Sequence, residues 1–363
     1  MVLLTIIVAI LILGILIFAH ELGHFVSAKK AGVKVEEFGF GFPPRIFSFK
    51  KGETVYSLNL IPIGGFVKIY GEERDGNETK SKFAFYNKPA WQRAIILLAG
   101  VFMNLVVAAI FLSIVHGIGV PTIIENGQEI NAKNIQIQII DVAKDSPAET
   151  AGIKIGDSIQ GLFYKTESVK VKTIEEVQGF ISLHIGEEIQ ITFRRGDEII
   201  SSRMTPRPNP PEGEGATGIA MAKTGLVSHP WYEAIWLGIK TTGQMIVTMV
   251  SLFYLLIKTL IMKGTMIGEV AGPVGIYNMT MHMVKLGWVY VLQFAALLSI
   301  NLAILNALPF PALDGGRLLF LLIEKIKGKP IKFKTERTAN AIGFAILIIL
   351  MIVVTFRDII KLF

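Results

Sequence analysis

Long runs of apolar residues without charged side chains recur along the chain. A helix needs roughly 20 such residues to cross the hydrocarbon of a bilayer. Four runs approach or exceed that length: Val2 to Ala19, Ala94 to Ile118, Trp288 to Leu308 and Ala339 to Phe356. The pattern predicts an α-helical polytopic membrane protein with four spans.

A further stretch, Ala234 to Met262, is apolar but is interrupted by Lys240, Gln244 and Lys258. It could cross the bilayer or lie flat as an amphipathic interfacial helix. If it crossed, the polar segments after the first and third spans would face opposite sides of the membrane, where they could not meet readily. We therefore favour an interfacial helix within residues 229–285.

Basic residues predict the orientation of the spans, because loops rich in Lys and Arg stay in the cytosol. Lys29 to Arg93 holds twelve Lys or Arg against seven Asp or Glu, and Arg317 to Arg337 holds seven against two. Both segments should face the cytosol, which leaves the middle of the chain on the outer side. The formal net charge of +7 is spread over such loops, and this distribution suits anionic lipid headgroups better than nucleic acid.

Residues 119–228 differ from the rest in having short, alternating apolar runs such as Ile135 to Val142 and Ile189 to Phe193. Gly, Asp and Asn turn signals separate these runs, as in a small β-rich soluble domain. The segment Pro206 to Pro211 has too few backbone donors to continue a sheet, so it is expected to be a connection. The sequence therefore predicts a soluble domain inserted after the second span.

The first apolar run leads directly into His20-Glu21-Leu22-Gly23-His24. Two imidazoles four residues apart on a helix lie about one turn apart on the same face and can bind one metal ion. The chain has no Cys, so nitrogen and carboxylate ligands are expected, and zinc suits two imidazoles, a carboxylate and an open position for water. Glu21 beside such a site is placed to take a proton from that water.

The same three polar residues have a simpler interpretation, in which they only mark where the helix leaves the bilayer for the headgroups. Ionisable side chains at the end of an apolar helix cost roughly 2.5 to 3.5 kcal/mol each on insertion scales. Three of them within five positions, at the H-E-x-x-H spacing, therefore favour a functional site.

A third ligand is predicted at Asp314, in the stretch Asn306 to Arg317 that closes the third apolar run. Pro309 and Pro311 interrupt the helix, and the two glycines after Asp314 permit close backbone approach. The carboxylate is therefore expected on irregular backbone that lines a polar cavity. Alone, an Asp at this point would also suit a helix cap, but its pairing with the histidine motif favours a ligand.

Together these residues resemble the site-2 protease family, in its bacterial branch of regulator of sigma-E proteases. The resemblance covers nearly the whole chain, with His-Glu-Leu-Gly-His in the first span and Leu-Asp-Gly after Pro-x-Pro. Four further motifs occur in the order that the family shows: Gly39-Phe-Gly41, Pro62 to Lys68, Ala99 to Asn104 and Gly272 to Gly275.

The resemblance implies an intramembrane zinc metalloprotease, in which His20, His24 and Asp314 bind Zn2+ and Glu21 is the general base. It also implies substrate contacts from the Pro-x-Pro motif and from a membrane-associated β-hairpin region between Gly39 and Lys68. The candidate substrate-binding residues are Asn306, Pro309, Pro311, Gly39, Gly41, Gly64 and Gly65.

The hairpin has a physical role in this scheme, because the peptide bonds of a helical substrate are shielded. An unwound substrate helix could add to the hairpin as an extra strand, which would expose the scissile bond. Tyr56 to Ile61 alternates as a strand should, and Gly64-Gly65 is expected to form a bend. An ordinary amphiphilic hairpin in the cytosol is the alternative.

Residues Asp145 to Ile159 resemble the helix entry and turn of a bacterial PDZ domain. Ser146 is expected to cap a helix, Pro147 to start it and Gly152 to end it. The resemblance implies a PDZ-like domain on the outer side, which excludes unclipped substrates or recognises exposed C-termini. This chain has one such repeat where some relatives have two, so a role as a spacer stays open.

The predicted function is hydrolysis of transmembrane segments of single-span proteins in the bacterial cytoplasmic membrane, after an upstream site-1 protease has removed their outer part. By resemblance, the substrates are anti-sigma factors or remnant signal peptides. An inert PDZ-bearing scaffold or substrate-binding membrane protein would be expected to lack Glu21 or a ligand. A transporter would show repeated halves with broken helices, and a protease with a soluble active site would not carry its motif in an apolar run.

In chain order, the prediction begins with a first span with the histidine motif (1–28), a cytosol-facing hairpin region (29–93) and a second span (94–118). An outer PDZ-like domain with its linker (119–228) and an interfacial helix region (229–285) follow. The chain then continues with a third span (286–308), the Leu-Asp-Gly motif with a cytosolic loop (309–338) and a fourth span (339–363). Asn104 is expected to support helix packing near the site rather than to contact substrate. The other histidines lack ligand-like spacing and are expected to be structural or solvated: His116, His184, His229 and His282.

Overall fold

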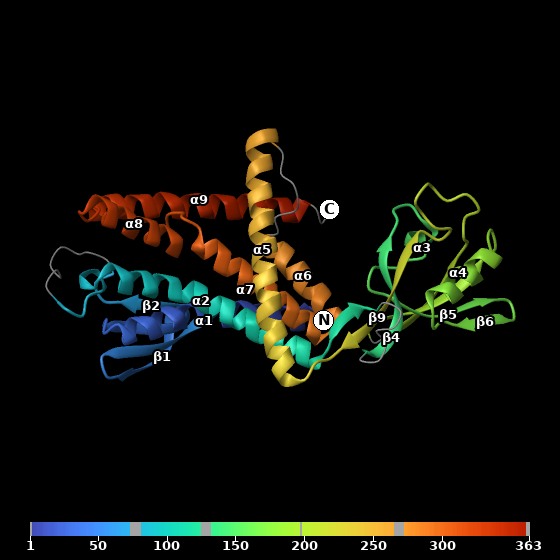
Figure 1. The fold of residues 1–363 in the computed structure, drawn as a ribbon, viewed down its shortest axis with the longest axis horizontal. Coiled ribbons are helices and arrows are strands. Elements are labelled where there is room, and N and C mark those ends of the chain that lie inside the picture. The colour runs from blue at the N-terminus through green and yellow to red at the C-terminus, as the bar shows by residue number, and fades with distance from the viewer. Residues whose placement is uncertain (1, 73–80, 125–131, 197, 265–271, 361–363) are drawn as a thin grey trace. The chain divides into compact units, whose positions relative to one another are not determined.

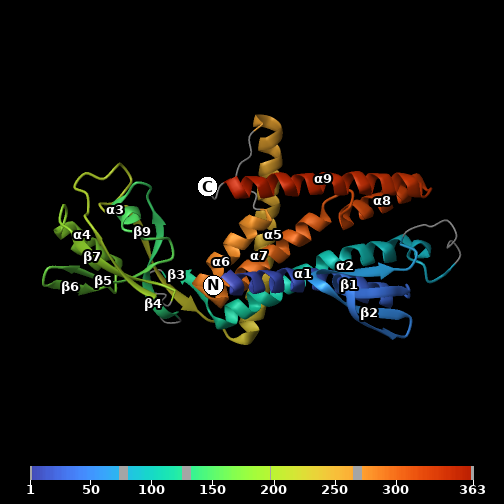
Figure 2. The same cartoon turned by 180° about the vertical axis from the view of Figure 1, so that it is seen from behind.

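The computed structural model describes residues 2–72, 81–124, 132–196, 198–264 and 272–360. Parts of the predicted ranges 29–93, 119–228 and 229–285 lie outside these residues. The chain divides into two units: Met1–Ser113, Ile235–Met283 and Val291–Phe363 form the first, and Ile114–Ala234 with Val284–Tyr290 form the second. Figure 1 and Figure 2 show the elements of both units from opposite sides.

The first unit is built mainly from apolar helices. They are α1 (Val2–Lys30), α2 (Ala90–Ile118), α5 (Trp231–Lys263), α6 (Pro273–Leu286), α7 (Trp288–Ala307), α8 (Asp314–Lys327) and α9 (Phe333–Ile360), with a short 3-10 turn at η1 (Phe85–Asn87). Among the described residues, five helices are long and apolar enough to cross a membrane: Val2–Lys30, Ala90–Ile118, Trp231–Thr259, Trp288–Ala307 and Lys334–Ile360. A multi-helix membrane protein is therefore confirmed.

The predicted total of four spans is not confirmed, because α5 also meets the length and hydropathy of a span. Its charged residues had favoured an interfacial position. Lys240 and Lys258 lie eighteen positions apart, which corresponds to about 27 Å along a helix. The apolar stretch between them approaches the thickness of a bilayer's hydrocarbon, so these two cations do not exclude a crossing.

Helices α1 and α2 lie side by side in both views (Figure 1 and Figure 2). Small residues make this approach possible, because a Cβ atom added to Gly23 would lie 2.3 Å from the carbonyl oxygen of Ala99. Helix α1 continues beyond the predicted apolar run to Lys30. The histidine motif is therefore inside the helix, as its i, i+4 spacing requires.

The hairpin region consists of two long antiparallel strands, β1 (Val35–Lys51) and β2 (Thr54–Ile69). They are joined at Gly52, whose φ of +65° is one that glycine adopts readily. Phe38 pairs with both Tyr56 and Val67, so the first half of β1 lies between two segments of β2. Strand β2 must bend between these segments, and Gly64, with φ of +103°, lies there. The predicted bend is confirmed.

Helix α6 begins at the predicted Gly272 to Gly275 motif, where α9 supplies its cap. The Asp358 carboxylate accepts hydrogen bonds from the backbone N–H groups of Gly272 and Gly275, at 2.9 and 2.8 Å. A carboxylate at this end of a helix satisfies unpaired N–H groups and suits the helix dipole. The motif therefore connects α6 to the C-terminal part of α9.

The second unit is β-rich, as predicted. A seven-stranded antiparallel sheet is ordered β3-β9-β4-β5-β7-β8, with β6 paired to β5. Its elements are β3 (Val120–Ile123), β4 (Ala132–Val142), α3 (Pro147–Thr150), β5 (Ser158–Tyr164), β6 (Glu167–Lys170), α4 (Ile174–Leu183), β7 (Ile189–Arg195), β8 (Glu198–Met204) and β9 (Ile219–Val227). Ser146 caps α3 by accepting from Glu149 N–H, Pro147 starts it, and Gly152 follows with φ of +75°.

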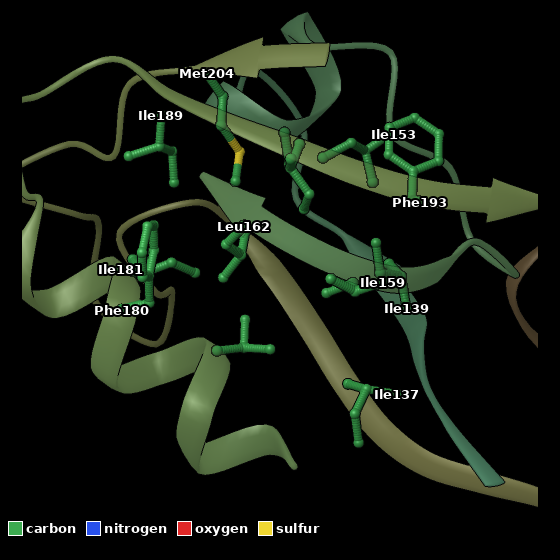
Figure 3. Close-up of a cluster of buried hydrophobic side chains, with 13 residues drawn as sticks. Ile137, Ile139, Ile153, Ile159, Leu162, Phe180, Ile181, Ile189, Phe193 and Met204 are labelled. Atoms are coloured by element: carbon green, nitrogen blue, oxygen red, sulfur yellow. The ribbon is translucent and has the colours of Figure 1, made fainter. Parts of the chain in front are cut away.

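The core of the second unit lies between the sheet and α4. Figure 3 shows Phe180 and Ile181 of α4 facing Leu162 of β5, with Ile189 and Met204 beside them. Leu162 and Ile189 are fully buried. The alternating apolar residues that predicted strands in this region are the ones that fill this core.

Candidate metal centre

Three side chains from two distant parts of the chain converge in the first unit. His20 and His24 lie on α1, and Asp314 is the first residue of α8. The Nε2 atoms of the two histidines are 3.2 Å apart. The Asp314 Oδ2 atom lies 3.0 Å from Nε2 of His20 and 3.3 Å from Nε2 of His24. The structure therefore brings together the three residues predicted as metal ligands.

The three separations suit one tetrahedrally coordinated ion. Zinc binds imidazole nitrogen and carboxylate oxygen at about 2.0 to 2.1 Å, so neighbouring ligand atoms of a tetrahedral site lie about 3.3 to 3.4 Å apart. The observed separations of 3.0 to 3.3 Å are equal to this separation or slightly shorter. Two imidazoles and one carboxylate also leave a fourth position for water. The residues present fit zinc.

Gly100 on α2 keeps the space beside the two imidazoles free. A Cβ atom added to Gly100 would lie 2.5 Å from Nε2 of His24 and 2.8 Å from Nε2 of His20. Those nitrogens are the atoms that would bind the metal. A side chain at Gly100 would therefore occupy the space that the ion needs, which explains why this position in α2 has none.

The Nδ1 atoms of both imidazoles also have polar partners. Nδ1 of His24 donates to the backbone carbonyl of Ile96 at 2.8 Å, which turns its Nε2 lone pair toward Asp314. Nδ1 of His20 lies 3.3 Å from the side-chain amide of Asn104. Metal binding through Nε2 would require a proton on Nδ1 of His20, and the amide of Asn104 would then have to turn its oxygen to that nitrogen to accept a hydrogen bond from it.

Asn104 also holds α2 to α7, because its backbone carbonyl accepts a hydrogen bond from the Ser299 hydroxyl at 2.7 Å. This contact is made by the backbone, so the predicted role of the Asn104 side chain in packing rather than in substrate contact stays a prediction. The contact with His20 was not predicted. The four-residue spacing from Gly100 to Asn104 is its only signal in the sequence, since it puts both residues on the same face of α2.

Glu21 lies beside the hairpin region. A Cβ atom added to Gly65 would lie 3.7 Å from Cγ of Glu21, and one added to Gly64 would lie 3.7 Å from Ile17 of α1. The Cβ position of Gly65 is also 3.0 Å from the carbonyl oxygen of Gly39 on the neighbouring strand β1. Of the predicted hairpin glycines, Gly65 therefore lies next to Glu21, and Gly64 lies next to α1 one turn earlier.

Asp314 does not lie on irregular backbone, as had been expected, but in the first turn of α8 after Leu313. The irregular part comes before it and includes Ala312, with φ of +78°. The Asp314 Oδ2 atom lies within 3.3 Å of both histidine Nε2 atoms, and a cation bound between them would favour the ionised carboxylate. The position at a helix N-terminus further favours the carboxylate.

The two glycines after Asp314 allow α8 to begin directly against the end of α7. Cβ atoms added to Gly315 and Gly316 would each come within 2.2 Å of a backbone oxygen of the preceding turn. Asn306 is partly exposed in the last turn of α7, Pro309 is exposed in the turn, and Pro311 is half-buried. The substrate contacts of these three residues stay predictions.

A helical, apolar chain that arranges two imidazoles, a carboxylate and a neighbouring glutamate in this way defines the class of metal-dependent hydrolases of membranes. The whole chain agrees with this class. It matches the family described as Peptidase family M50 over residues 8–350, and the chain belongs to that family. It is a zinc metalloprotease.

The chain is similar along its length to several bacterial proteins. A relative from Clostridium acetobutylicum is 35% identical over 359 residues, which cover 98% of this chain and 97% of the relative. "Regulator of sigma-W protease RasP" of Bacillus subtilis is 31% identical, and "Zinc metalloprotease RasP" of Bacillus licheniformis is 32% identical. Each of these two alignments covers 99% of both chains.

Proposed function

We propose that this zinc metalloprotease hydrolyses peptide bonds within the transmembrane segments of single-span proteins. The observation that carries the proposal is the position of His20, Glu21 and His24 inside α1, a helix long and apolar enough to cross a membrane. Ionisable side chains in such a helix are costly unless they face partners or a polar site. A site of this kind is best suited to peptide bonds at the same depth.

The chemistry follows from the groups at the site. Zinc, when bound, polarises the scissile carbonyl and lowers the pKa of its water to about 7. We assign His20, His24 and Asp314 as its ligands. Glu21 takes the proton of the attacking water and passes it to the leaving amine. Asn306 lies eight positions before Asp314, in the last turn of α7, and is assigned to the substrate backbone.

The hairpin region is proposed to present the substrate. The segment from Arg45 to Lys51 pairs with β2 along one side among the described strand pairs. Its outward apolar side chains include Phe47, which is 58% exposed, and Phe49, which is 51% exposed. A free edge with exposed apolar side chains suits an extended apolar peptide. Gly41, whose Cβ position is 2.6 Å from the Ile61 carbonyl oxygen, keeps these strands close together.

The identity of the second unit, the orientation in the membrane and the substrates are also proposals. The β-rich second unit is assigned as a PDZ-like domain on the outer side of the bacterial cytoplasmic membrane, with the metal centre toward the cytosol. The name of the Bacillus subtilis relative refers to regulation of a sigma factor. That name supports anti-sigma factors as substrates, cut after an upstream site-1 protease has acted, with remnant signal peptides as a second group.

The test is a cleavage assay in detergent with a single-span peptide flanked by soluble segments. Mass spectrometry should find the cut inside the apolar segment. Placing a Pro or a Gly pair in that segment should speed cleavage, because unwinding the substrate helix exposes its peptide bonds. The matched control carries the same substitution in a soluble flank and should be cut at the unmodified rate. Cleavage confined to the flanks would contradict the proposal.

A further inference from the structure

Helix α8 carries Asp314, and its first turn is held by residues outside the metal centre. Arg317, one turn after Asp314, forms an ion pair with Glu72, which lies three residues after the end of β2. On the other side of Asp314, the side-chain oxygen of Asn340 on α9 accepts a hydrogen bond from Ala312 N–H at 3.0 Å. Polar contacts from two different parts of the fold thus hold the chain just before and just after Asp314.

The remainder of α8 is held by a second set of polar contacts, which lines the same pocket as Glu72 and Arg317. Arg93 of α2 donates to Glu324 at 3.0 Å, and both side chains are nearly buried. The Tyr86 hydroxyl also donates to Glu324, at 3.2 Å. Glu324 is ten residues after Asp314, which corresponds to about 15 Å along the helix. This second network stabilises the far end of α8 without reaching the ligand.

The ion pair has a geometric consequence for the metal centre. Asp314 comes immediately after a turn in which Ala312 has a positive φ, a conformation that is unfavourable for a residue with a side chain. The turn would relax if it were released. Arg317 and Glu72 hold the first turn of α8 against the segment that follows β2, and Gly65 of β2 lies next to Glu21.

We propose that Glu72 and Arg317 are positioning residues, which fix the Asp314 carboxylate at coordination distance from His20 and His24. The proposal rests on the assigned role of Asp314 as a metal ligand. Neither residue touches the reacting atoms; both act through the first turn of α8. Contacts that orient metal ligands in this way contribute about 10- to 100-fold to metal affinity or activity.

The experiment measures the rate at which zinc passes from the purified full-length protein to an excess of a coloured chelator. Glu72→Gln and Arg317→Gln should each release zinc about 10- to 100-fold faster than the unmodified protein. The double variant should release it no faster than the worse single variant, because the two residues act as one pair. Arg317→Lys keeps the charge and should recover part of the loss.

Glu324→Gln is the matched control, because it removes a buried ion pair from the same helix at its far end. It should lower thermal stability but keep the original rate of zinc release. Equal release rates for Arg317→Gln and the unmodified protein, or an equal acceleration by Glu324→Gln, would overturn the positioning role. Asp314→Asn distinguishes a failure of the positioning role from a failure of the ligand assignment. If this variant also left zinc release unchanged, the assigned ligand set itself would be wrong.

Discussion

The Glu21→Gln variant is expected to lose peptide hydrolysis by at least about 10²- to 10⁴-fold, the contribution of a positioned general base, while it keeps its zinc. The amide is nearly the same size as the carboxylate but cannot take the proton of the attacking water. Glu21 is not among the three groups that converge on the ion. Initial cleavage rates and zinc content, measured on the same preparations, check both parts.

Glu53→Gln is the control for this change, because Glu53 is exposed on the hairpin region, where it pairs with Lys29. It should cleave at the original rate. Unchanged cleavage by the Glu21→Gln variant would mean that another group accepts the proton. Loss of zinc together with activity would show that Glu21 belongs to the coordination shell instead.

A methyl group at position 100 should reduce cleavage by a similar factor, because it disturbs zinc binding rather than proton transfer. Gly100→Ala places Cβ within 2.8 Å of both ligand nitrogens, so either the imidazoles move apart or α2 moves away from α1. Tight packing leaves little room for such movement. The variant should lose zinc and cleavage together, by an amount comparable to removal of a ligand. Zinc content and cleavage in detergent are the measurements.

Gly243→Ala provides the comparison for this variant. Gly243 also lies inside a long apolar helix, α5, and nothing is within 4 Å of its Cβ position. The substitution should leave zinc and activity intact, and it should favour the helix by up to about 1 kcal/mol. Full zinc occupancy in Gly100→Ala would show that the site is not as closed as its geometry indicates.

The sequence predicted the parts of this protein that depend on local pattern. The H-E-x-x-H spacing places both histidines on one face of any helix, and the apolar run around it predicts that helix. The cap at Ser146 and the bend at Gly64 follow from residue types with strong backbone preferences. The β-rich second unit followed from alternation, since its inward residues form the core.

Contacts between segments far apart in the chain were harder to predict from the sequence. Asp314 was identified from its motif and the family resemblance, but its place at the start of α8 depends on the close packing of Gly315 and Gly316 on the preceding turn. No local pattern relates Asn104 to His20 or Glu72 to Arg317, because each pair is joined only when segments far apart in sequence pack together. Whether α5 crosses the membrane stays a prediction, because its two lysines favour an interfacial position while the apolar length between them is that of a span.

The most direct test of the central claim is the zinc content of the purified protein, measured by mass spectrometry after dialysis, with and without Asp314→Asn. Two imidazoles on α1 and a carboxylate 290 positions later should hold a single ion. The unmodified chain should then retain about one zinc, and the variant, left with two protein ligands, should lose most of it. Full zinc retention by Asp314→Asn would contradict the account.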